Sequence, residues 1–425
     1  MNHHPVRRAF AACLLLTLVA PAAWAAQLER PLTGLTHQRL DGNRLIDGRG
    51  KLPSGAPVDI RLGRPVNWVV GVPIGATGSL WVAVLDDGSL HAVALREGKA
   101  DRIPNFEPAR LEGPPILMRL GRAVTVLAPS THGSPLSHPV PIARQQRVAF
   151  VSENGLLSLA TFIGSGRSGL NVRIPLDARI VADDRGRLLT LSDPTTRYAH
   201  GALGDTEEAA SMTIVDAASK PRVERRIEFP ESQVFEGLAP IWVDWNRDGK
   251  REIVATLSSD QAGAQIVLFS EDGQRIGESA PVGTGHRWRH AIAVAPFGPN
   301  GETELAEVVT PHLGRTVQFL NWRGERLEPA AKIQGFTSHV NGSRNLDLAA
   351  AGDFDGDGRV ELLIPDGDLG ALSGIRRTES GASVAWTVAL PAPLSSNIGG
   401  IVLEGGQMVV AAGLADGTLR FWGAR

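Results

Sequence analysis

The residues best suited to chemistry lie in a short acidic segment, residues 353–361. Positions 1, 3, 5, 6 and 9 of this segment are Asp353, Asp355, Asp357, Gly358 and Glu361. Oxygen side chains at alternate positions converge, the glycine permits a sharp turn, and the main-chain carbonyl at position 7, that of Arg359, faces the same way. Three carboxylates held this close repel one another unless a cation lies between them. We therefore expect the segment to bind Ca²⁺.

A second segment, residues 244–252, repeats the pattern with one charge fewer. Its oxygen ligands would be Asp244, Asn246, Asp248 and Glu252, with the main-chain carbonyl of Lys250 at position 7. We expect weaker Ca²⁺ binding here, because the amide ligand is neutral and basic residues lie nearby. A third copy, residues 296–304, has proline and glycine at positions 1 and 3, so we expect it to hold no metal. Because all the ligands of each site come from one contiguous loop, we expect the cations to be structural and not catalytic. The alternative to cation binding is that each segment is a solvated Asp/Gly-rich turn.

The three segments recur at a spacing that predicts the fold. Their first positions are residues 244, 296 and 353, which are 52 and 57 residues apart. Short apolar runs of strand length flank each segment, glycine-containing turns follow, and no amphipathic helix of credible length appears after residue 25. A period near fifty with several short strands per unit is typical of propeller blades. We expect an all-β chain: a single β-propeller of about seven four-stranded blades over residues 26–425, clearest at 238–365.

The two ends of this region are expected to close the ring. Met408–Ala412 and Thr418–Trp422 have the composition of strands, and we expect the segment Asn43–Ile60 to share a blade with them, which removes open sheet edges. The alternative is a pair of β-sandwich domains, but no linker or shift of composition divides the chain. Residues 96–150 are rich in proline and irregular, so the first blades are the least defined.

The two acidic segments resemble the FG-GAP/VCBS repeat, the Ca²⁺-loop blade of integrin α-chain propellers and of many exported bacterial proteins. The resemblance is carried by the acids at positions 1, 3, 5 and 9 and by the glycine at position 6 in both segments. It covers three units directly, roughly residues 238 to 365, and the rest of the chain by period alone. The resemblance implies an integrin α N-terminal-like propeller with bound Ca²⁺. It is unspecific for function, because the repeat occurs in adhesion proteins, lectin-like modules and enzyme appendages.

Residues 1–25 have the layout of a secretory signal peptide. Arg7 and Arg8 precede an apolar run over residues 9–20, and residues 23–25, Ala-Trp-Ala, form a small-x-small cleavage site. The run is too short to span a bilayer, and no second apolar stretch could do so. The general export route is favoured over the twin-arginine route. We therefore expect a periplasmic or secreted protein with no membrane span after cleavage.

The composition excludes several kinds of site and partner. Cys13 is the only cysteine, so the mature chain would have no thiol for disulfides, zinc–thiolate sites, iron–sulfur clusters or nucleophilic catalysis. The formal charge is -2 at pH 7, without a basic excess. Nucleic acid and anionic membrane surfaces are therefore not expected as partners.

A second set of polar and aromatic residues is expected at the ends of the blades opposite the acidic segments. The inner strand of each blade would run from that end to the acidic loop, so residues that precede each segment gather near the axis. The candidates are His200, Arg287, Trp288, His290, His312, His339, Arg344 and Asn345. The histidines suit a transition metal or proton transfer, and the arginines suit a carboxylate or sugar acid. The other interpretation is that these residues hydrogen-bond strand ends.

Two functions from different classes follow from this arrangement. The preferred one is a calcium-stabilised binding or interaction module for a glycan, a peptide or a partner protein. The alternative is a propeller enzyme, either a polysaccharide lyase or hydrolase or a metal-dependent oxidoreductase, that uses histidine and arginine residues of the face opposite the calcium loops. The sequence has no Gly-x-Ser-x-Gly, His-Glu-x-x-His or Walker motif, so no catalytic residue is assigned.

Overall fold

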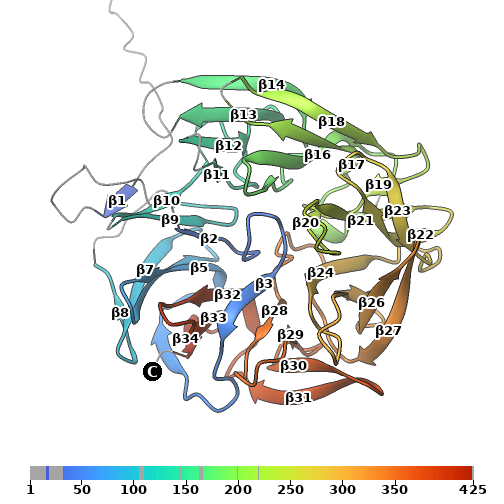
Figure 1. The fold of residues 1–425 in the computed structure, drawn as a ribbon. Coiled ribbons are helices and arrows are strands. Elements are labelled where there is room, and N and C mark those ends of the chain that lie inside the picture. The colour runs from blue at the N-terminus through green and yellow to red at the C-terminus, as the bar shows by residue number, and fades with distance from the viewer. Residues whose placement is uncertain are drawn as a thin grey trace, which may run out of the picture.

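The computed structural model describes residues 16–18, 32–104, 110–121, 123–129, 131–142, 146–161, 166–198, 200–218 and 220–423. Within these ranges the regular structure is β-strand, apart from one 3₁₀ turn, η2 (Gly201–Leu203). The strands form antiparallel units that follow one another around a ring, as in a β-propeller (Figure 1). The predicted all-β propeller fold is therefore confirmed. The described residues contain no helix long and apolar enough to cross a membrane.

The blades are numbered here around the ring. Blade 1 contains β5 (Val66–Ile74), β6 (Gly78–Leu85), β7 (Leu90–Arg96) and β8 (Lys99–Arg102); blade 2 contains β2 (Leu32–Gly34), β9 (Ile116–Leu120), β10 (Ala123–Leu127) and β1 (Leu16–Leu18). Blade 3 contains β11 (Val140–Ile142), β12 (Arg147–Val151), β13 (Leu156–Thr161) and β14 (Arg167–Arg173); blade 4 contains β15 (Val181–Ala182), β16 (Arg187–Thr195), β17 (Glu208–Asp216) and β18 (Arg222–Glu228).

The second half of the ring follows the same plan. Blade 5 contains β20 (Ile241–Val243), β21 (Glu252–Ser259), β22 (Gly263–Phe269) and β23 (Arg275–Ser279); blade 6 contains β24 (Arg289–Ala295), β25 (Glu304–Val309), β26 (Thr316–Arg323) and β27 (Arg326–Gln334). Blade 7 contains β28 (Ala350–Asp353), β29 (Glu361–Pro365), β30 (Ala371–Thr378) and β31 (Gly381–Ala389), and blade 8 contains β32 (Leu394–Val402), β33 (Met408–Leu414), β34 (Thr418–Trp422) and β4 (Val58–Arg61). The short strand β19 (Val234–Phe235) joins blades 4 and 5.

The pairings of the described residues define eight blades, one more than the sequence indicated. Blade 2 explains the difference, because its strands come from separate parts of the chain: β2 pairs with β9, and β1 pairs with β10. Such a blade has no fixed spacing along the sequence, so a search for a period cannot find it. Of the predicted signal peptide only residues 16–18 are described, as β1, and the rest of that prediction lies outside the described residues.

The predicted closure of the ring is confirmed. Strand β4 lies antiparallel to β34, with Leu419 opposite Ile60, and so completes blade 8 from the N-terminal side. Strand β3 (Leu45–Arg49), which precedes it, lies parallel to β28 of blade 7. One N-terminal segment thus pairs with strands of two neighbouring blades, and its pairing with β34 completes blade 8 and closes the ring.

The core is divided into apolar layers between neighbouring blades. One layer joins Trp81 of β6 to Phe421 of β34, both fully buried, with ring centroids 5.4 Å apart. Another joins β24 and β25 to β28 and β29. All eight residues of β6 and of β21 are buried, because these strands have a blade on each side. This burial on both faces accounts for the continuous apolar runs seen in the sequence.

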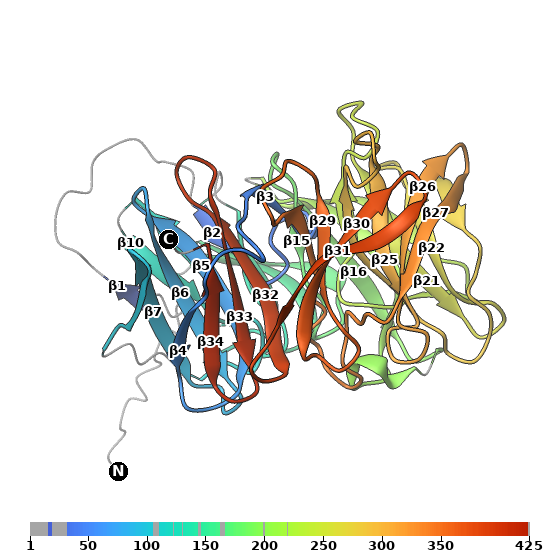
Figure 2. The ribbon, with the colours of Figure 1, turned by 90° about the horizontal axis from the view of Figure 1, so that it is seen from below.

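The centre of the ring is filled by residues 35–44. The main-chain oxygen of Leu40 accepts a hydrogen bond from β15 (2.7 Å), and that of Arg44 accepts one from β28 (2.8 Å). Gln38 donates through Nε2 to a carbonyl of β32 (2.7 Å), and Asn43 exchanges two hydrogen bonds with β24 (2.9 and 3.0 Å). Because this segment binds inner strands of four blades, the chain itself occupies the axis, and ligands must approach from the surface. Figure 2 shows the ring from the side, with strands running between its two faces.

Candidate functional site

The acidic loop between β28 and β29 brings three of its predicted ligands together. Carboxylate oxygens of Asp353, Asp355 and Glu361 all lie within 4.8 Å of one another. The loop is shaped by its own backbone: Asp353 accepts N–H groups from Gly356 (2.8 Å) and Gly358 (3.0 Å). Burial raises the pKa of Glu361 to about 7 and also raises the pKa of Asp353. The ligand type and the convergence fit a hard cation such as Ca²⁺.

A protein cation also reaches these carboxylates. Arg376 of β30 contacts Glu361, lies 2.7 Å from Asp355 through Nη2, and lies 2.9 Å from Asp357 through Nη1. Its side chain is only 17% exposed. The guanidinium therefore neutralises part of the charge that we expected Ca²⁺ to neutralise, and the sequence pattern of the loop gave no sign of it. The remaining predicted ligand residue, Arg359, uses its own side chain elsewhere, on the carbonyl of Arg377 (2.8 Å).

The loop between β20 and β21 has a similar backbone but a looser arrangement of acids. Asp244 accepts the N–H of Gly249 (3.1 Å), Asn246 contacts Asp248 through both backbone and side chain, and Asp248 accepts the N–H of Lys250 (2.8 Å). Among the described residues, the group of converging acids is found at the 353 loop and not here. Unlike the carboxylates of the 353 loop, the carboxylates of this loop form no ion pair with a basic side chain among the described residues.

The glutamate at position 9 has a structural role common to two of the loops. Glu252 accepts the N–H of Trp245 (2.8 Å), and Glu361 accepts the N–H of Phe354 (3.0 Å). Burial raises the pKa of Glu252, as it does for Glu361. The corresponding Glu304 of the third copy instead forms a buried ion pair with Arg377 of blade 7 (2.9 Å). Position 9 therefore holds a structural contact in all three copies, within the loop in two of them and to the neighbouring blade in the third.

Loops at the opposite end of the strands form a second candidate site. They are residues 174–180, 198, 200–205, 236–240, 281–288, 310–315 and 336–347, and we call this surface the His200 face. The loops are joined by direct contacts: the N–H of Gly342 donates to Ala202 (2.9 Å), and Thr337 Oγ1 donates to the carbonyl of Pro311 (3.0 Å). The prediction that these segments gather at one end is thus matched by their contacts.

The predicted ligand residues of this face divide into accessible and buried groups. Arg287 is exposed, and His200, His312 and Arg344 are half-buried. The other four are buried, namely Trp288, His290, His339 and Asn345. Trp288 packs against leucines beneath the loops and stacks on His290, with ring centroids 4.9 Å apart. The aromatic group that we expected to meet a ligand is therefore part of the support of the face.

Two hydrogen-bonded histidines fix the proton positions on this face. His200 Nδ1 contacts the buried carboxylate of Glu236, which accepts its N–H. His339 Nε2 lies 2.6 Å from the carbonyl oxygen of Ser343, which can only accept, so its Nδ1 accepts from His312 Nε2 at 2.7 Å. Burial lowers the pKa of His339 to about 4 and also lowers the pKa of His312. Both rings are therefore neutral near pH 7.

A group of acids that the sequence did not single out lies among these histidines. Burial, with the nearby charge of Glu236, raises the pKa of Glu208 to about 10. Burial and the neighbouring Asp205 raise the pKa of Asp177 to about 6, against the pull of Arg344. Arg344 bridges these two aspartates at 3.0 and 2.7 Å. Asp205 and Glu208 lie at the β16–β17 connection of blade 4, whereas Asp177 lies in the segment before β15, and no shared motif marks them, so only their meeting in the fold identifies them.

A buried ion-pair cluster supports the face from below. Asp347 lies 2.8 Å from Arg44 and 2.6 Å from Arg179, and all three side chains are buried. Burial opposes ionisation of Asp347, but the two arginines outweigh it and hold its pKa well below the ordinary value. His37 and His138 stack nearby with ring centroids 5.3 Å apart, and burial lowers the pKa of His138 to about 3. This cluster is structural, because it is closed to solvent.

The His200 face also carries exposed apolar side chains. Leu313 is 81% exposed, Val340 is 44% exposed and Leu176 is 40% exposed. All three lie in its loops, next to His312, His339 and Asp177 respectively. The other exposed large apolar residues of the described chain, Leu32, Val223 and Val384, lie on strands.

The comparisons with known proteins show no family for this chain. No family model matches it, and no curated protein sequence matches it. The computationally designed protein Ika8 aligns with 89% of this chain and 99% of its own, at 9% identity and a TM-score of 0.48. BamB from Moraxella catarrhalis aligns with 86% of this chain and 98% of its own, at 14% identity and a TM-score of 0.42. The propeller assignment therefore rests on the strand pairing of this chain itself.

Proposed function

We propose that this protein is an exported, calcium-stabilised binding module that docks a partner protein or peptide on the His200 face. The observation that carries the proposal is the grouping of Leu176, Leu313 and Val340 in the loops of that face. Exposed apolar groups beside polar ones are typical of protein–protein contact surfaces. The segment 35–44 fills the axis, so the surface loops are the part of this end that a ligand can reach.

The side chains of the face favour a polypeptide over a glycan. Its exposed apolar groups are aliphatic, whereas Tyr198 and Trp288, which a sugar ring could stack on, are buried. Half-buried His200, His312 and Arg344 supply hydrogen-bonding groups around the apolar ones. A peptide that offers apolar side chains and backbone carbonyls satisfies both kinds of group.

The test uses peptides selected on the wild-type protein from a displayed library. The face variant Leu313→Glu/Val340→Glu is compared with the control Val223→Glu/Val384→Glu, whose valines are 46% and 44% exposed on outer strands. We expect the selected peptides to bind the wild type and the control with equal affinity, and the face variant at least tenfold more weakly. Peptides that bind the face variant normally, or that lose binding to the control, would refute the docking site.

We also propose Ca²⁺ at the 353 loop, with a weaker site at the 244 loop. The support is the convergence of Asp353, Asp355 and Glu361 at the first loop, together with the FG-GAP/VCBS-like spacing of both. A cation bound only by the folded protein stabilises it by about 2.7 kcal/mol at a hundredfold excess over Kd. EDTA should therefore lower the melting temperature and Ca²⁺ should restore it. Asp353→Ala with Asp357→Ala should remove most of this response, and a purified protein without calcium dependence would contradict the proposal.

A second candidate function is the enzymatic one, and a single observation favours it. His200 is held by the buried carboxylate of Glu236 with its Nε2 free, which is the arrangement of an oriented general base. A polysaccharide lyase would need such a base. Incubation with acidic polysaccharides, followed at the absorbance of unsaturated products, tests this function. Activity that His200→Gln abolishes would favour the enzyme, and activity unchanged by that substitution would exclude His200 as the base.

A further inference from the structure

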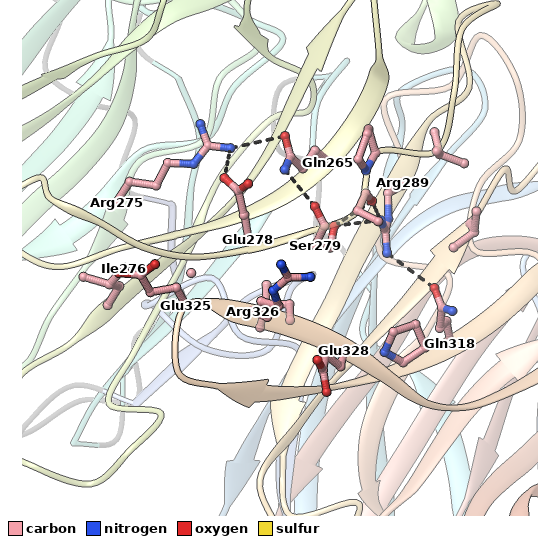
Figure 3. Close-up of a pocket in the computed structure, with 17 residues that line it drawn as sticks. Gln265, Arg275, Ile276, Glu278, Ser279, Arg289, Gln318, Glu325, Arg326 and Glu328 are labelled. Atoms are coloured by element: carbon pink, nitrogen blue, oxygen red, sulfur yellow. Dashed lines mark hydrogen bonds and ion pairs between the residues drawn. The ribbon is translucent and has the colours of Figure 1, made fainter.

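A cavity of about 750 Å³ lies between blades 5 and 6, and of its lining only Pro281 and Val282 belong to a loop of the His200 face (Figure 3). Strand β23 pairs with β22 of its own blade and also, in parallel, with β27 of blade 6, at Glu278 opposite Arg326 and Ser279 opposite Leu327. This pairing bridges the two blades and closes one side of the space between them. The volume is that of a pocket for a small ligand.

One wall of the cavity is a chain of hydrogen-bonded polar side chains, all of them buried except the half-buried Gln318. Arg289 is 5% exposed; its Nε lies 2.9 Å from the fully buried Glu307, and its Nη1 donates to Ser279 Oγ at 2.7 Å. Its Nη2 donates to Gln318 Oε1 (3.4 Å), and Gln265 donates to the carbonyl of Ser279 (2.7 Å). Figure 3 shows Gln265, Ser279, Arg289 and Gln318 linked in a row. Because Gln318 uses its oxygen on Arg289, its amide nitrogen keeps its donors for a ligand.

The facing strand β27 supplies charges that remain unpaired. Arg326 and Glu328 stand two residues apart, so they project from the same side of the strand. Both are exposed, both line the cavity, and neither makes an ion pair with another described residue. Arg275, by contrast, is committed to Glu278 (2.5 Å). The cavity therefore presents one free guanidinium, that of Arg326, and the free carboxylates of Glu325 and Glu328, together with the amide donor of Gln318.

We propose that this cavity binds a small zwitterion, namely a free amino acid or a short peptide with both charged ends. Arg326 would pair with the ligand carboxylate by two parallel hydrogen bonds, with Gln318 as a further donor, and Glu328 would pair with the ammonium group. A ligand of one charge would satisfy one of these side chains and be repelled by the other. A zwitterion satisfies both, and the inference does not depend on the function of the His200 face.

The test compares three matched ligands by isothermal titration: L-alanyl-L-alanine, its N-acetyl derivative and its C-terminal amide. We expect saturable binding of the dipeptide, with each blocked derivative at least tenfold weaker. Arg326→Gln should weaken the dipeptide at least tenfold but leave the amide unaffected, and Glu328→Gln should weaken the dipeptide but leave the N-acetyl derivative unaffected. The control is Arg323→Gln, an exposed arginine of the same hairpin that does not line the cavity.

Three results would overturn the proposal. The first is no saturable dipeptide binding up to about 10 mM, beyond the millimolar range of the weakest specific ligands. The second is equal binding of all three ligands, which would show that the charged ends are not recognised. The third is binding that Arg323→Gln weakens as much as Arg326→Gln, which would place the ligand elsewhere. Circular dichroism of each variant confirms that the fold is retained.

Discussion

Replacing Arg376 by glutamine separates the two cations that can neutralise the 353 loop. The guanidinium contacts three carboxylates, and one of them, Glu361, has a side chain with no exposed surface. Removing the charge leaves these acids facing one another in a partly buried site. Breaking a fully buried ion pair costs about 3–5 kcal/mol. Since Arg376 and Asp355 are 17% and 19% exposed, we expect a smaller loss of about 2–3 kcal/mol in EDTA.

The same substitution should strengthen calcium binding. Even at the dielectric constant of water, a divalent ion about 4 Å from a guanidinium is repelled by about 2 kcal/mol. Without that repulsion, the Kd for Ca²⁺ should fall by about thirtyfold. Compared with the wild type, the variant should therefore be less stable in EDTA but should be stabilised more when Ca²⁺ is added. Arg376→Lys, which keeps the charge, should resemble the wild type in both respects.

Differential scanning calorimetry in EDTA and in a calcium series measures both effects. At about 2.1 cal/mol/K per residue, a folded region of about 390 residues has an unfolding entropy near 0.8 kcal/mol/K, so 2–3 kcal/mol corresponds to about 3 °C. A melting temperature of Arg376→Gln in EDTA within about 1 °C of the wild type would show that the guanidinium does not stabilise the loop. An identical calcium response in both proteins would show that the ion does not bind beside Arg376.

Three further predictions concern buried charge. Glu208→Gln should raise the free energy of unfolding by up to about 5 kcal/mol at pH 8 and by little near pH 4, because the folded protein keeps this proton up to a pKa of about 10 whereas the unfolded chain releases it near 4.5. Chemical denaturation as a function of pH measures the difference, and the exposed Glu207→Gln should have no such effect. The wild type should lose about 1.4 kcal/mol of unfolding free energy per pH unit as the pH falls from 6.5 to 4, because the unfolded chain protonates His138 in this range and the folded protein does not. His138→Gln should remove this slope, and an unchanged slope in the variant would contradict the reasoning. Asp347→Asn should lower the free energy of unfolding, measured in urea, by about 3–5 kcal/mol, because it leaves two buried arginines unpaired. Asp59→Asn, which breaks an exposed ion pair, should lower it by under about 1 kcal/mol, and equal losses in the two variants would refute the argument.

The strand framework was accessible from the sequence wherever local signals repeat. The acids and glycines at residues 244–252 and 353–361 mark the turns between inner strands, and the pairing of β4 with β34 followed from the need to close the ring. The blade count was wrong by one, because blade 2 joins β2 to β9 and β10 across a long stretch of chain. A local pattern records neighbours in sequence, and this blade is made of neighbours in space.

The candidate sites show the same division. The histidines of the far face were identifiable by residue type, but type alone did not show that Trp288 and His290 are buried while His200 and His312 are half-buried. The acids around them, such as Glu208, have ordinary sequence surroundings. Their chemistry depends on burial and on charged groups such as Glu236 that the fold brings close, and a local sequence pattern records neither.

What the sequence determined by itself was the repeating unit: the strand period, the turn residues and the acidic side chains within one loop, all of which depend on contacts between residues close along the chain. The tertiary structure alone decided where the charges are balanced. Arg376 reaches the acidic loop from the neighbouring strand of its blade, Arg44 and Arg179 reach Asp347 from distant parts of the chain, and β23 meets β27 across two blades. Electrostatic energy depends on the distance between charges and on their burial, and only the folded ring brings these charged groups close together and buries them.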